Sequence, residues 1–528
     1  MARKVFISFL GYSYYIPCVY TREYIKDKNK KIFKSDEVNY IQIATMDYFQ
    51  EIGRELDEER TWTKDDKAYI VLTEGAEKNN WNTNETLKHR DTGETSPGLC
   101  SCFGKKKEKG EYQFEVIPIK EIPDGNNEEQ LFKIFDTVFN KVFKNIKDGE
   151  ETELYFDVTH SFRSLPMLAL VMANYVKFLR NVKVKSITYG NYEARKKVGT
   201  KEVVVNGECK TREVYEAPII DLTPLSQIQD WTFAAADIIR NGNSNRLYEL
   251  AKSSYLIQML RTKNALNMSD RLMEKKIQDY VESLHEMLQN MRLCSLPKIM
   301  DYSIMDNVNK KYNDAKNQMS GVMYPIQPIL EKVKETFKDF KENQDIQNGF
   351  FAAKWCCEHQ LYQQAITILN ENITTDFCKK IGLDESIYEQ RNFAASYLRN
   401  EKNDYNTDEL KKINTNSPNS AENFKNRYKN IEILSYKERY SHIAVWTHDK
   451  RNMFNHAAMT KVAKVKDGRL YYAREILTIH DINDLKDIVI PYVLNPLDGI
   501  REKAKEYLLD TTQKELRNEI LKLIQSSK

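Results

Sequence analysis

Short apolar runs alternate with helix-like stretches over residues 4–190, and this alternation constrains the fold more than any other feature of the sequence. The runs include Lys4–Leu10, Ala68–Leu72 and Leu154–Phe156, each followed by a polar or glycine-containing turn. Between the first two, Tyr40–Ile52 has apolar residues at helical spacing. Strands that alternate with helices are typical of a parallel sheet covered on both faces. The sequence therefore predicts a doubly wound, Rossmann-like α/β domain.

Two other stretches of this region have local signatures. Asn206-Gly207 lies inside the strand-like segment Lys201–Ile220 and predicts a β-hairpin. Glu85–Gly110 is polar, contains glycine and carries the run Lys105-Lys106-Lys107. We expect this stretch to be a surface loop, and its lysine run favours a solvated loop over a nucleic-acid-binding one.

Polar turns follow the predicted strands. Ligands of open parallel sheets bind beyond the carboxyl ends of the strands, so these turns should gather around one site. They are Gly11-Tyr12-Ser13, Thr73-Glu74, Asp157–Arg163 and Gly190-Asn191. The first strand is followed by GYSYY, without the G-x-G-x-x-G pattern, which argues against a nicotinamide or flavin site.

The turn after Leu154–Phe156 carries the strongest chemical signal. It leads into LPMLALVMANYVKFL, an apolar stretch long enough for a buried helix, and Thr159 and Ser161 are suitable N-cap residues. A helix start directs backbone N–H groups and a positive dipole end at a ligand. His160 adds a titratable ring and Arg163 a bidentate cation. This combination suits a phosphate group.

Charge, hydropathy and cysteine pattern exclude several classes of protein. The 528 residues contain 80 Lys and Arg against 77 Asp and Glu, a net charge of +3, so any nucleic-acid surface must be local. No apolar run reaches membrane-spanning length and the N-terminus lacks a signal-peptide pattern, which predicts a soluble, cytoplasmic protein without membrane contact. The eight scattered cysteines lack zinc-site spacing, so we expect free thiols and no metal.

Beyond Pro224 the apolar spacing is mainly helical, and one polar cluster stands out. Arg451, Asn452 and His456 lie within six residues. Five residues on a regular helix separate Arg451 and His456 by about 140°, so either a helix begins near this point or a second copy of the chain completes the site. Arginine and histidine together suit metal-free RNA cleavage. The spacing alone favours a solvated helix face over a catalytic site.

These motifs resemble those of the CARF–HEPN ribonucleases of type III CRISPR systems. KVFISFLG is similar to the first strand and glycine loop of the family. DVTHSFR is similar to its D-x-T-H-G-x-R motif, with Ser161 where the family often has glycine. RNMFNH resembles the HEPN signature of arginine, a polar residue, three variable residues and histidine.

In that family an N-terminal CARF domain senses a cyclic oligoadenylate and a C-terminal HEPN domain degrades RNA. The resemblance implies a metal-independent endoribonuclease without a cofactor, which cleaves single-stranded RNA in CRISPR antiviral defence. It implies a homodimer that is allosterically activated by cyclic tetra-adenylate, or in second place by cyclic hexa-adenylate. It also implies a CARF domain over residues 1–222, a helical connector over 223–344 and a HEPN domain over 345–528.

The resemblance assigns site residues in both halves. Arg451 and His456 would be catalytic, with Asn452 supporting their geometry. The activator would contact residues of the predicted turns: Gly11, Tyr12, Ser13, Thr73, Thr159, His160, Ser161 and Arg163.

Two further hypotheses stay open. The chain could be a CARF-type sensor that binds nucleic acid as a transcription regulator, although such a protein has no use for RNMFNH. Alternatively, the CARF domain could also cleave its own activator, because Thr159, His160 and Ser161 could position the reacting 2′-hydroxyl and stabilise charge. Neither the ring size of the activator nor the RNA sequence preference follows from the sequence.

Overall fold

The computed structural model divides the chain into two compact units. The first unit comprises residues 1–230 and 253–271, and the second comprises residues 231–252 and 272–528. Within them the structure describes residues 2–26, 29–56, 61–83, 88–89, 92–144, 146–147, 150–159, 165–180, 182–254, 256–257, 268–300, 302–341, 345–402, 404–413, 421–455, 461–466, 469–474, 478–495, 498–509 and 513–526.

A mixed sheet forms the centre of the first unit. Its strands run in the order β3-β2-β9-β7-β6-β1-β4-β5, with β8 paired to β9. The neighbours from β7 to β5 are all parallel, whereas β9 runs antiparallel to β7. The strands are β1 (Arg3–Leu10), β2 (Cys18–Lys26), β3 (Asn29–Val38), β4 (Lys67–Thr73), β5 (Glu115–Ile122), β6 (Thr152–Asp157), β7 (Val182–Gly190), β8 (Lys196–Val205) and β9 (Glu208–Asp221).

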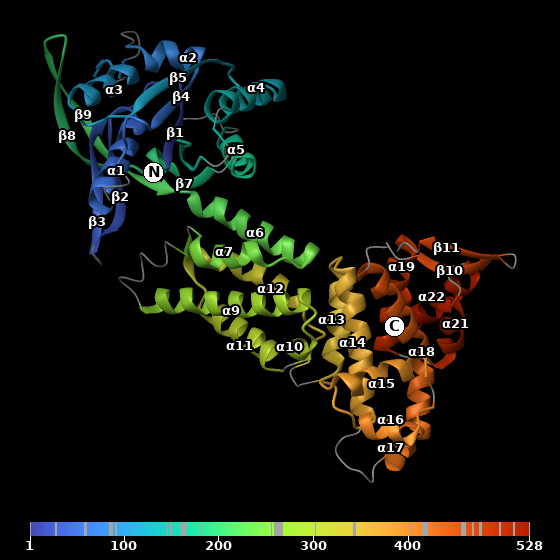
Figure 1. Ribbon diagram of the computed structural model, residues 1–528. Helices are drawn as coiled ribbons and strands as arrows, with labels where there is room; N and C mark the ends of the chain where they lie inside the picture. The colour runs from blue at the N-terminus through green and yellow to red at the C-terminus, as the bar shows by residue number, and fades with distance from the viewer. Residues whose placement is uncertain are drawn as a thin grey trace. The chain divides into compact units, whose positions relative to one another are not determined.

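Helices cover both faces of this sheet, as Figure 1 shows. In β1, Phe6 and Leu10 pack into the core beneath α1 (Ile41–Leu56) and α3 (Leu99–Glu108). Val5, Ile7 and Phe9, at the alternate positions of β1, pack into the core beneath α4 (Glu128–Val138) and α5 (Leu165–Leu179). Because alternate side chains of a strand face opposite sides of the sheet, β1 contributes to the hydrophobic cores on both faces. The predicted Rossmann-like α/β fold is confirmed.

Two local predictions have different outcomes. The hairpin at Asn206-Gly207 is confirmed: both residues have positive φ, 54° and 85°, between β8 and β9. The prediction of a loop over Glu85–Gly110 is wrong in its second half, where α3 begins at Leu99. The helix buries Leu99 and Phe103, one turn apart, and Lys106 forms ion pairs with Asp47 and Glu111 at 3.1 and 2.7 Å.

The hairpin of β8 and β9 leaves one strand largely in solvent. Nearly all of β8 is exposed, and among the described residues it pairs only with β9. Its register shifts between Lys197 and Gly199. β8 is therefore an edge strand of the sheet.

The second unit is mainly helical, as expected. Its α13 packs on α14, and α14 packs on α18, while β10 (Lys461–Lys466) and β11 (Arg469–Arg474) form a small antiparallel ribbon. Trp355, Tyr280 and Tyr492 are among its fully buried side chains. The described helices of at least seven residues are α7 (Asn245–Ser253), α9 (Met268–Arg292), α11 (Tyr302–Gln318), α12 (Gln327–Glu335), α13 (Gln347–Glu358), α14 (Tyr362–Lys380), α15 (Tyr388–Leu398), α16 (Thr407–Ile413), α17 (Ala421–Tyr428), α18 (Ile431–Asn455), α21 (Asp498–Leu509) and α22 (Lys514–Ser526). The division between the units falls within α6 (Thr223–Asn241), near the end of α7 and near the start of α9.

None of the described helices is both long and apolar enough to cross a membrane. Over the same residues, no group of three or more His, Cys, Asp and Glu side chains is arranged to hold a metal ion.

Candidate functional site

The parallel register of the sheet brings the predicted turns of the first unit to one edge. Ser8 pairs with Asp157 across β1 and β6, and Asp157 pairs with Thr188 of β7. On the other side of β1, Leu10 pairs with Leu72 of β4. The turns that begin at Gly11, Thr73, Val158 and Asn191 therefore all follow the carboxyl ends of adjacent strands, where α/β sheets hold ligands.

Asp157 is the centre of a buried hydrogen-bond network below this edge. Its Oδ2 accepts the Ser8 hydroxyl at 2.6 Å, and its Oδ1 accepts the Thr159 hydroxyl at 2.5 Å and the Thr159 N–H at 3.3 Å. Gln42 donates to Ser8 at 3.0 Å, and the Gly190 N–H donates to Thr159 at 2.8 Å. The network joins β1, β6, β7 and α1 directly beneath the predicted activator turn.

The carboxyl group of Asp157 has no solvent exposure. Burial raises its pKa from 3.8 to about 6, because the charged form loses hydration that the hydroxyl groups of Ser8 and Thr159 only partly replace. No ion-pair partner of Asp157 occurs among the described residues. The position thus holds a carboxyl group that can change charge near neutral pH.

Two asparagines hold the turn after β1. The Asn80 amide donates to the carbonyl oxygens of Gly11 and Ser13 at 2.9 and 2.8 Å, and Asn79 donates to that of Tyr12 at 3.0 Å. Both lie in a π-helical turn, η2 (Glu77–Trp81), after β4. The Tyr12 side chain remains 54% exposed, so this turn presents an aromatic ring on a supported backbone.

The remaining predicted activator residues fall into two groups. Thr73 is buried, and its hydroxyl accepts the Ala76 N–H at 3.3 Å as the N-cap of α2 (Glu74–Ala76). His160, Ser161 and Arg163 lie outside the described residues. The structure therefore places Gly11, Tyr12, Ser13, Thr73 and Thr159 at one sheet edge.

The second polar cluster lies at the C-terminal end of a long helix. Arg451 and Asn452 belong to the last turns of α18, which ends at Asn455, and His456 lies outside the described residues. The expectation that a helix begins near this point is wrong. Helix α18 begins at Ile431, and its buried residues between Tyr440 and Thr447 lie on several sides of the helix rather than along one stripe.

Arg451 forms an ion pair that reaches across to α14. Its Nη1 lies 2.5 Å from Glu371 Oε1, and the other oxygen of that carboxylate is bound by Arg391 of α15. All three side chains are about one-quarter to one-third exposed. Two guanidinium groups share one carboxylate, so the cluster keeps a net positive charge at the surface of the second unit.

Asn452 contacts a histidine one turn earlier in α18. Its amide nitrogen lies 3.0 Å from His448 Nε2. Burial and the nearby Arg399 lower the pKa of His448, which favours the neutral ring. His448 is thus an internal residue of α18.

Several of these supporting residues could not be found from motif spacing. Glu371 and Arg391 are separated from Arg451 by 80 and 60 positions in the sequence, and neither belongs to a recognisable motif. The sequence did offer one indication of Asn79 and Asn80: they lie shortly after Thr73-Glu74, the turn that follows the neighbouring parallel strand β4. Gln42 lies on the predicted helix Tyr40–Ile52. The apolar residues of that stretch predict the helix, but they do not indicate a role for Gln42.

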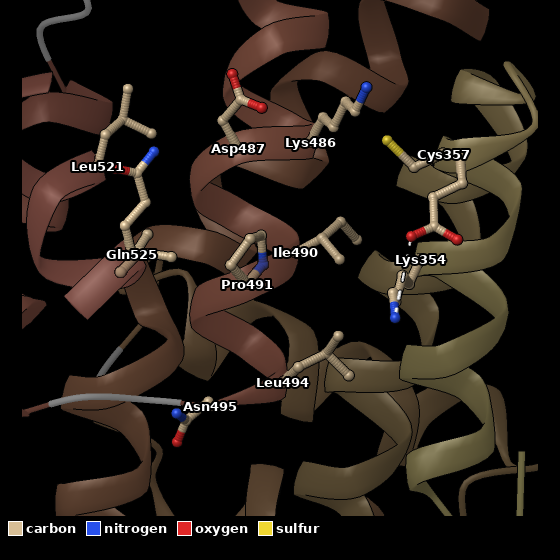
Figure 2. Close-up of a pocket in the computed structure, with 12 residues that line it drawn as sticks. Lys354, Cys357, Lys486, Asp487, Ile490, Pro491, Leu494, Asn495, Leu521 and Gln525 are labelled. Carbon is tan, nitrogen blue, oxygen red and sulfur yellow. Dashed lines mark ion pairs between the residues drawn. The ribbon is translucent and has the colours of Figure 1, made fainter. Parts of the chain in front are cut away.

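A separate cavity of about 490 Å³ lies within the second unit (Figure 2). Its lining includes the apolar side chains of Ile490, Leu494 and Leu521. Lys354 and Glu358 also line it and pair at 3.9 Å. None of its lining residues is among the predicted site residues.

Comparison with known proteins finds a family match within the first unit. Residues 5–193 match the family described as CRISPR system endoribonuclease Csx1, CARF domain. The CRISPR-associated protein MJ1674 of Methanocaldococcus jannaschii is 25% identical over 283 residues, which cover 53% of this chain and 37% of that relative. A structure of Enterococcus italicus Csm6 bound to cyclic hexa-2'-fluoro-hexa-dAMP aligns with 98% of this chain and 100% of its own, at 10% identity and a TM-score of 0.32. That score is too low for any inference about this chain.

Proposed function

From the match of residues 5–193 to the CARF domain of the Csx1 family, we propose that this chain is an endoribonuclease of CRISPR antiviral defence. We propose that a cyclic oligoadenylate activates it. The observation that carries this proposal is the family match itself, since its description names an endoribonuclease. The proposal includes a CARF domain over residues 1–222, a connector over 223–344 and a HEPN domain over 345–528.

The activator would bind at the sheet edge of the first unit. Five of the proposed contact residues lie there: Gly11, Tyr12, Ser13, Thr73 and Thr159. Tyr12 offers an exposed ring on which an adenine can stack. His160, Ser161 and Arg163 complete the proposed set, and their side chains suit the phosphates. Cyclic tetra-adenylate is the first candidate and cyclic hexa-adenylate the second.

RNA cleavage would take place at the end of α18. In our proposal Arg451 stabilises the charge that develops on the phosphate, and His456 exchanges protons with the reacting 2′-hydroxyl or the leaving oxygen. Asn452 supports this geometry and is itself held by His448. The chemistry needs no metal ion, and the substrate is single-stranded RNA.

We propose that the active species is a homodimer whose two copies meet along α5. Its outward side chains Met167, Val171, Tyr175 and Phe178 form an apolar stripe, and Phe178 is 89% exposed. Helix α5 begins directly after the proposed activator segment. A two-fold axis at this stripe would therefore bring two such segments together around one ring of repeated nucleotides.

The deciding experiment incubates the purified full chain with a fluorescent single-stranded RNA and each cyclic oligoadenylate in turn. We expect cleavage only with the matching ring, and loss of cleavage in Arg451→Ala and His456→Ala with activator binding retained. Arg501→Ala is a matched control, because Arg501 lies in the same unit with 30% exposure against 31% for Arg451.

Activator binding without RNA cleavage would contradict the nuclease proposal and favour a sensor that regulates by binding nucleic acid. Consumption of the activator in the same incubation would reveal the additional ring-cleaving activity.

A further inference from the structure

Arg451 is bound at one corner of its guanidinium group. Nη1 donates to Glu371 at 2.5 Å, and no other hydrogen bond of this side chain occurs within the described part of the chain. Nε is buried without a partner. Because Nε has no contact with solvent and Nη1 is bound by Glu371, Nη2 is the nitrogen of this guanidinium group that remains for a charge-assisted hydrogen bond to a phosphate oxygen.

Glu371 is itself held by Arg391. Nε of Arg391 lies 3.1 Å from Oε2 of Glu371, and Nη2 binds the same oxygen. Arg391 is anchored in turn, because Nη1 donates to the Thr375 hydroxyl at 2.9 Å and Nη2 donates to the Glu371 carbonyl at 3.0 Å. The carboxylate that meets Arg451 is therefore a prearranged group and not a free surface side chain.

We infer that Glu371, held by Arg391, is a positioning residue that orients Nη2 of Arg451 toward the scissile phosphate. The inference rests on the proposed ribonuclease function and assigns it two residues outside the RNMFNH motif. Neither Glu371 nor Arg391 contacts the RNA. Glu371 removes the rotational freedom of Arg451, while Arg391 supplies the positive charge that keeps the cluster attractive to an anion.

The first test measures kcat and KM for RNA cleavage by Glu371→Gln and Arg391→Lys at saturating cyclic tetra-adenylate, or hexa-adenylate if that ring activates. In Glu371→Gln the amide offers one oxygen to two guanidinium groups, so its NH₂ must face the donors of Arg391 or of Arg451 and the cluster must rearrange. We expect kcat to fall about 10- to 100-fold, the range for misplacement of a catalytic group. The activator concentration at half-maximal rate should not change, because activator binding does not involve this cluster.

Asp376→Asn is the matched control. Asp376 lies on the same helix and also links α14 to α18, through the Tyr436 hydroxyl at 2.8 Å, but it touches neither arginine of the cluster. Its cleavage rate should equal that of the wild type. An equal loss in Asp376→Asn would mean that general packing of α14 on α18, not orientation of Arg451, explains the effect.

A second test uses chemical rescue, which a purely structural role would not affect. Guanidinium ion added to Arg451→Ala should restore part of the cleavage, because Glu371 binds the ion where the side chain was. The double variant Arg451→Ala/Glu371→Gln should show no rescue, and without guanidinium it should be no slower than Arg451→Ala alone.

The outcomes separate the two proposals. If Arg451→Ala retains full activity, the ribonuclease assignment of this site fails, and the positioning role fails with it. If Arg451→Ala is inactive but Glu371→Gln cleaves at the wild-type rate, only the positioning role is overturned. A rise of activator-independent cleavage in Glu371→Gln would also overturn it and identify the ion pair as an inhibitory contact.

Discussion

Replacing Asp157 by asparagine should stabilise the first unit at neutral pH, although it alters a fully buried and hydrogen-bonded residue. The asparagine Oδ1 can keep both bonds from Thr159. Its NH₂ group would take the place of Oδ2 and donate to Ser8, whose hydroxyl can turn toward the Phe9 carbonyl, already 3.3 Å away. The substitution thus keeps the network and removes only the charge.

The expected gain in stability follows from the shift in the pKa of Asp157. A rise from 3.8 to about 6 corresponds to about 3 kcal/mol against the ionised form in the folded state. Because the folded pKa lies above the unfolded one, the stabilising contribution of Asp157 is complete below pH 3.8 and is lost as the pH rises through about 6. Asparagine does not titrate, so the advantage of the variant should grow over that interval.

The assay is hydrogen exchange of β1 and β6 in the full chain, compared between wild type and Asp157→Asn. Exchange reports local opening free energies, which a single melting curve of a two-unit protein does not. The protection of the variant relative to the wild type should increase by about 50-fold between about pH 4 and pH 7. All other titrating groups are common to both proteins and cancel.

Asp221→Asn serves as the control. Asp221 accepts the N–H and hydroxyl of Thr223 just as Asp157 accepts those of Thr159, but its Oδ2 pairs with Arg22 at 3.1 Å. Its neutralisation should weaken the unit and give no gain at higher pH. A relative protection of Asp157→Asn that is independent of pH, or faster exchange in this variant at pH 7, would refute the account of Asp157 as a poorly solvated carboxylate.

Four further predictions concern the switch, the chemistry, the assembly and acid stability. Arg163→Ala should raise the activator concentration for half-maximal RNA cleavage and leave the saturated rate nearly unchanged; an unshifted midpoint in the titration would place the activator elsewhere. EDTA should leave the rate unchanged in the same assay, and inhibition would contradict a metal-independent reaction. Phe178→Asp should convert the dimer to a monomer in sedimentation, and a persisting dimer would exclude the α5 stripe as its contact. Burial lowers the pKa of His442 from 6.5 to about 4. The free energy of unfolding around α18 should therefore fall by about 3 kcal/mol as the pH drops from 6.5 to about 4. Hydrogen exchange of α18 should show this pH dependence in the wild type and lack it in His442→Phe.

The sequence predicted the sheet domain well because its strands are short, apolar and bounded by turns. Lys4–Leu10 and Ala68–Leu72 each match an observed strand to within one residue at either end. The polar region before Gly110 was misjudged because α3 buries only two apolar side chains and contains Gly104, which weakens any helical pattern.

A candidate site was predictable from the sequence only where its residues are neighbours along the chain. Asp157 and Thr159 lie in one turn, and a strand-to-helix transition marks them. Glu371, which binds Arg451, and Arg391, which binds Glu371, come from two other helices, and their contacts depend on how α14, α15 and α18 pack. Such packing is decided by many apolar contacts at once, so the pairing of Glu371 with Arg391 leaves no trace in local spacing.

The exposed strand β8 has a consequence for the behaviour of the protein in concentrated solution. An edge strand offers free backbone donors and acceptors to any other chain, and Val198 and Val204 add exposed apolar surface here. Lysines at 196, 197 and 201 and the register shift at Gly199 oppose such pairing through charge repulsion and a local twist. Neutral replacements of these three lysines would remove that repulsion and turn β8 into a template for aggregation.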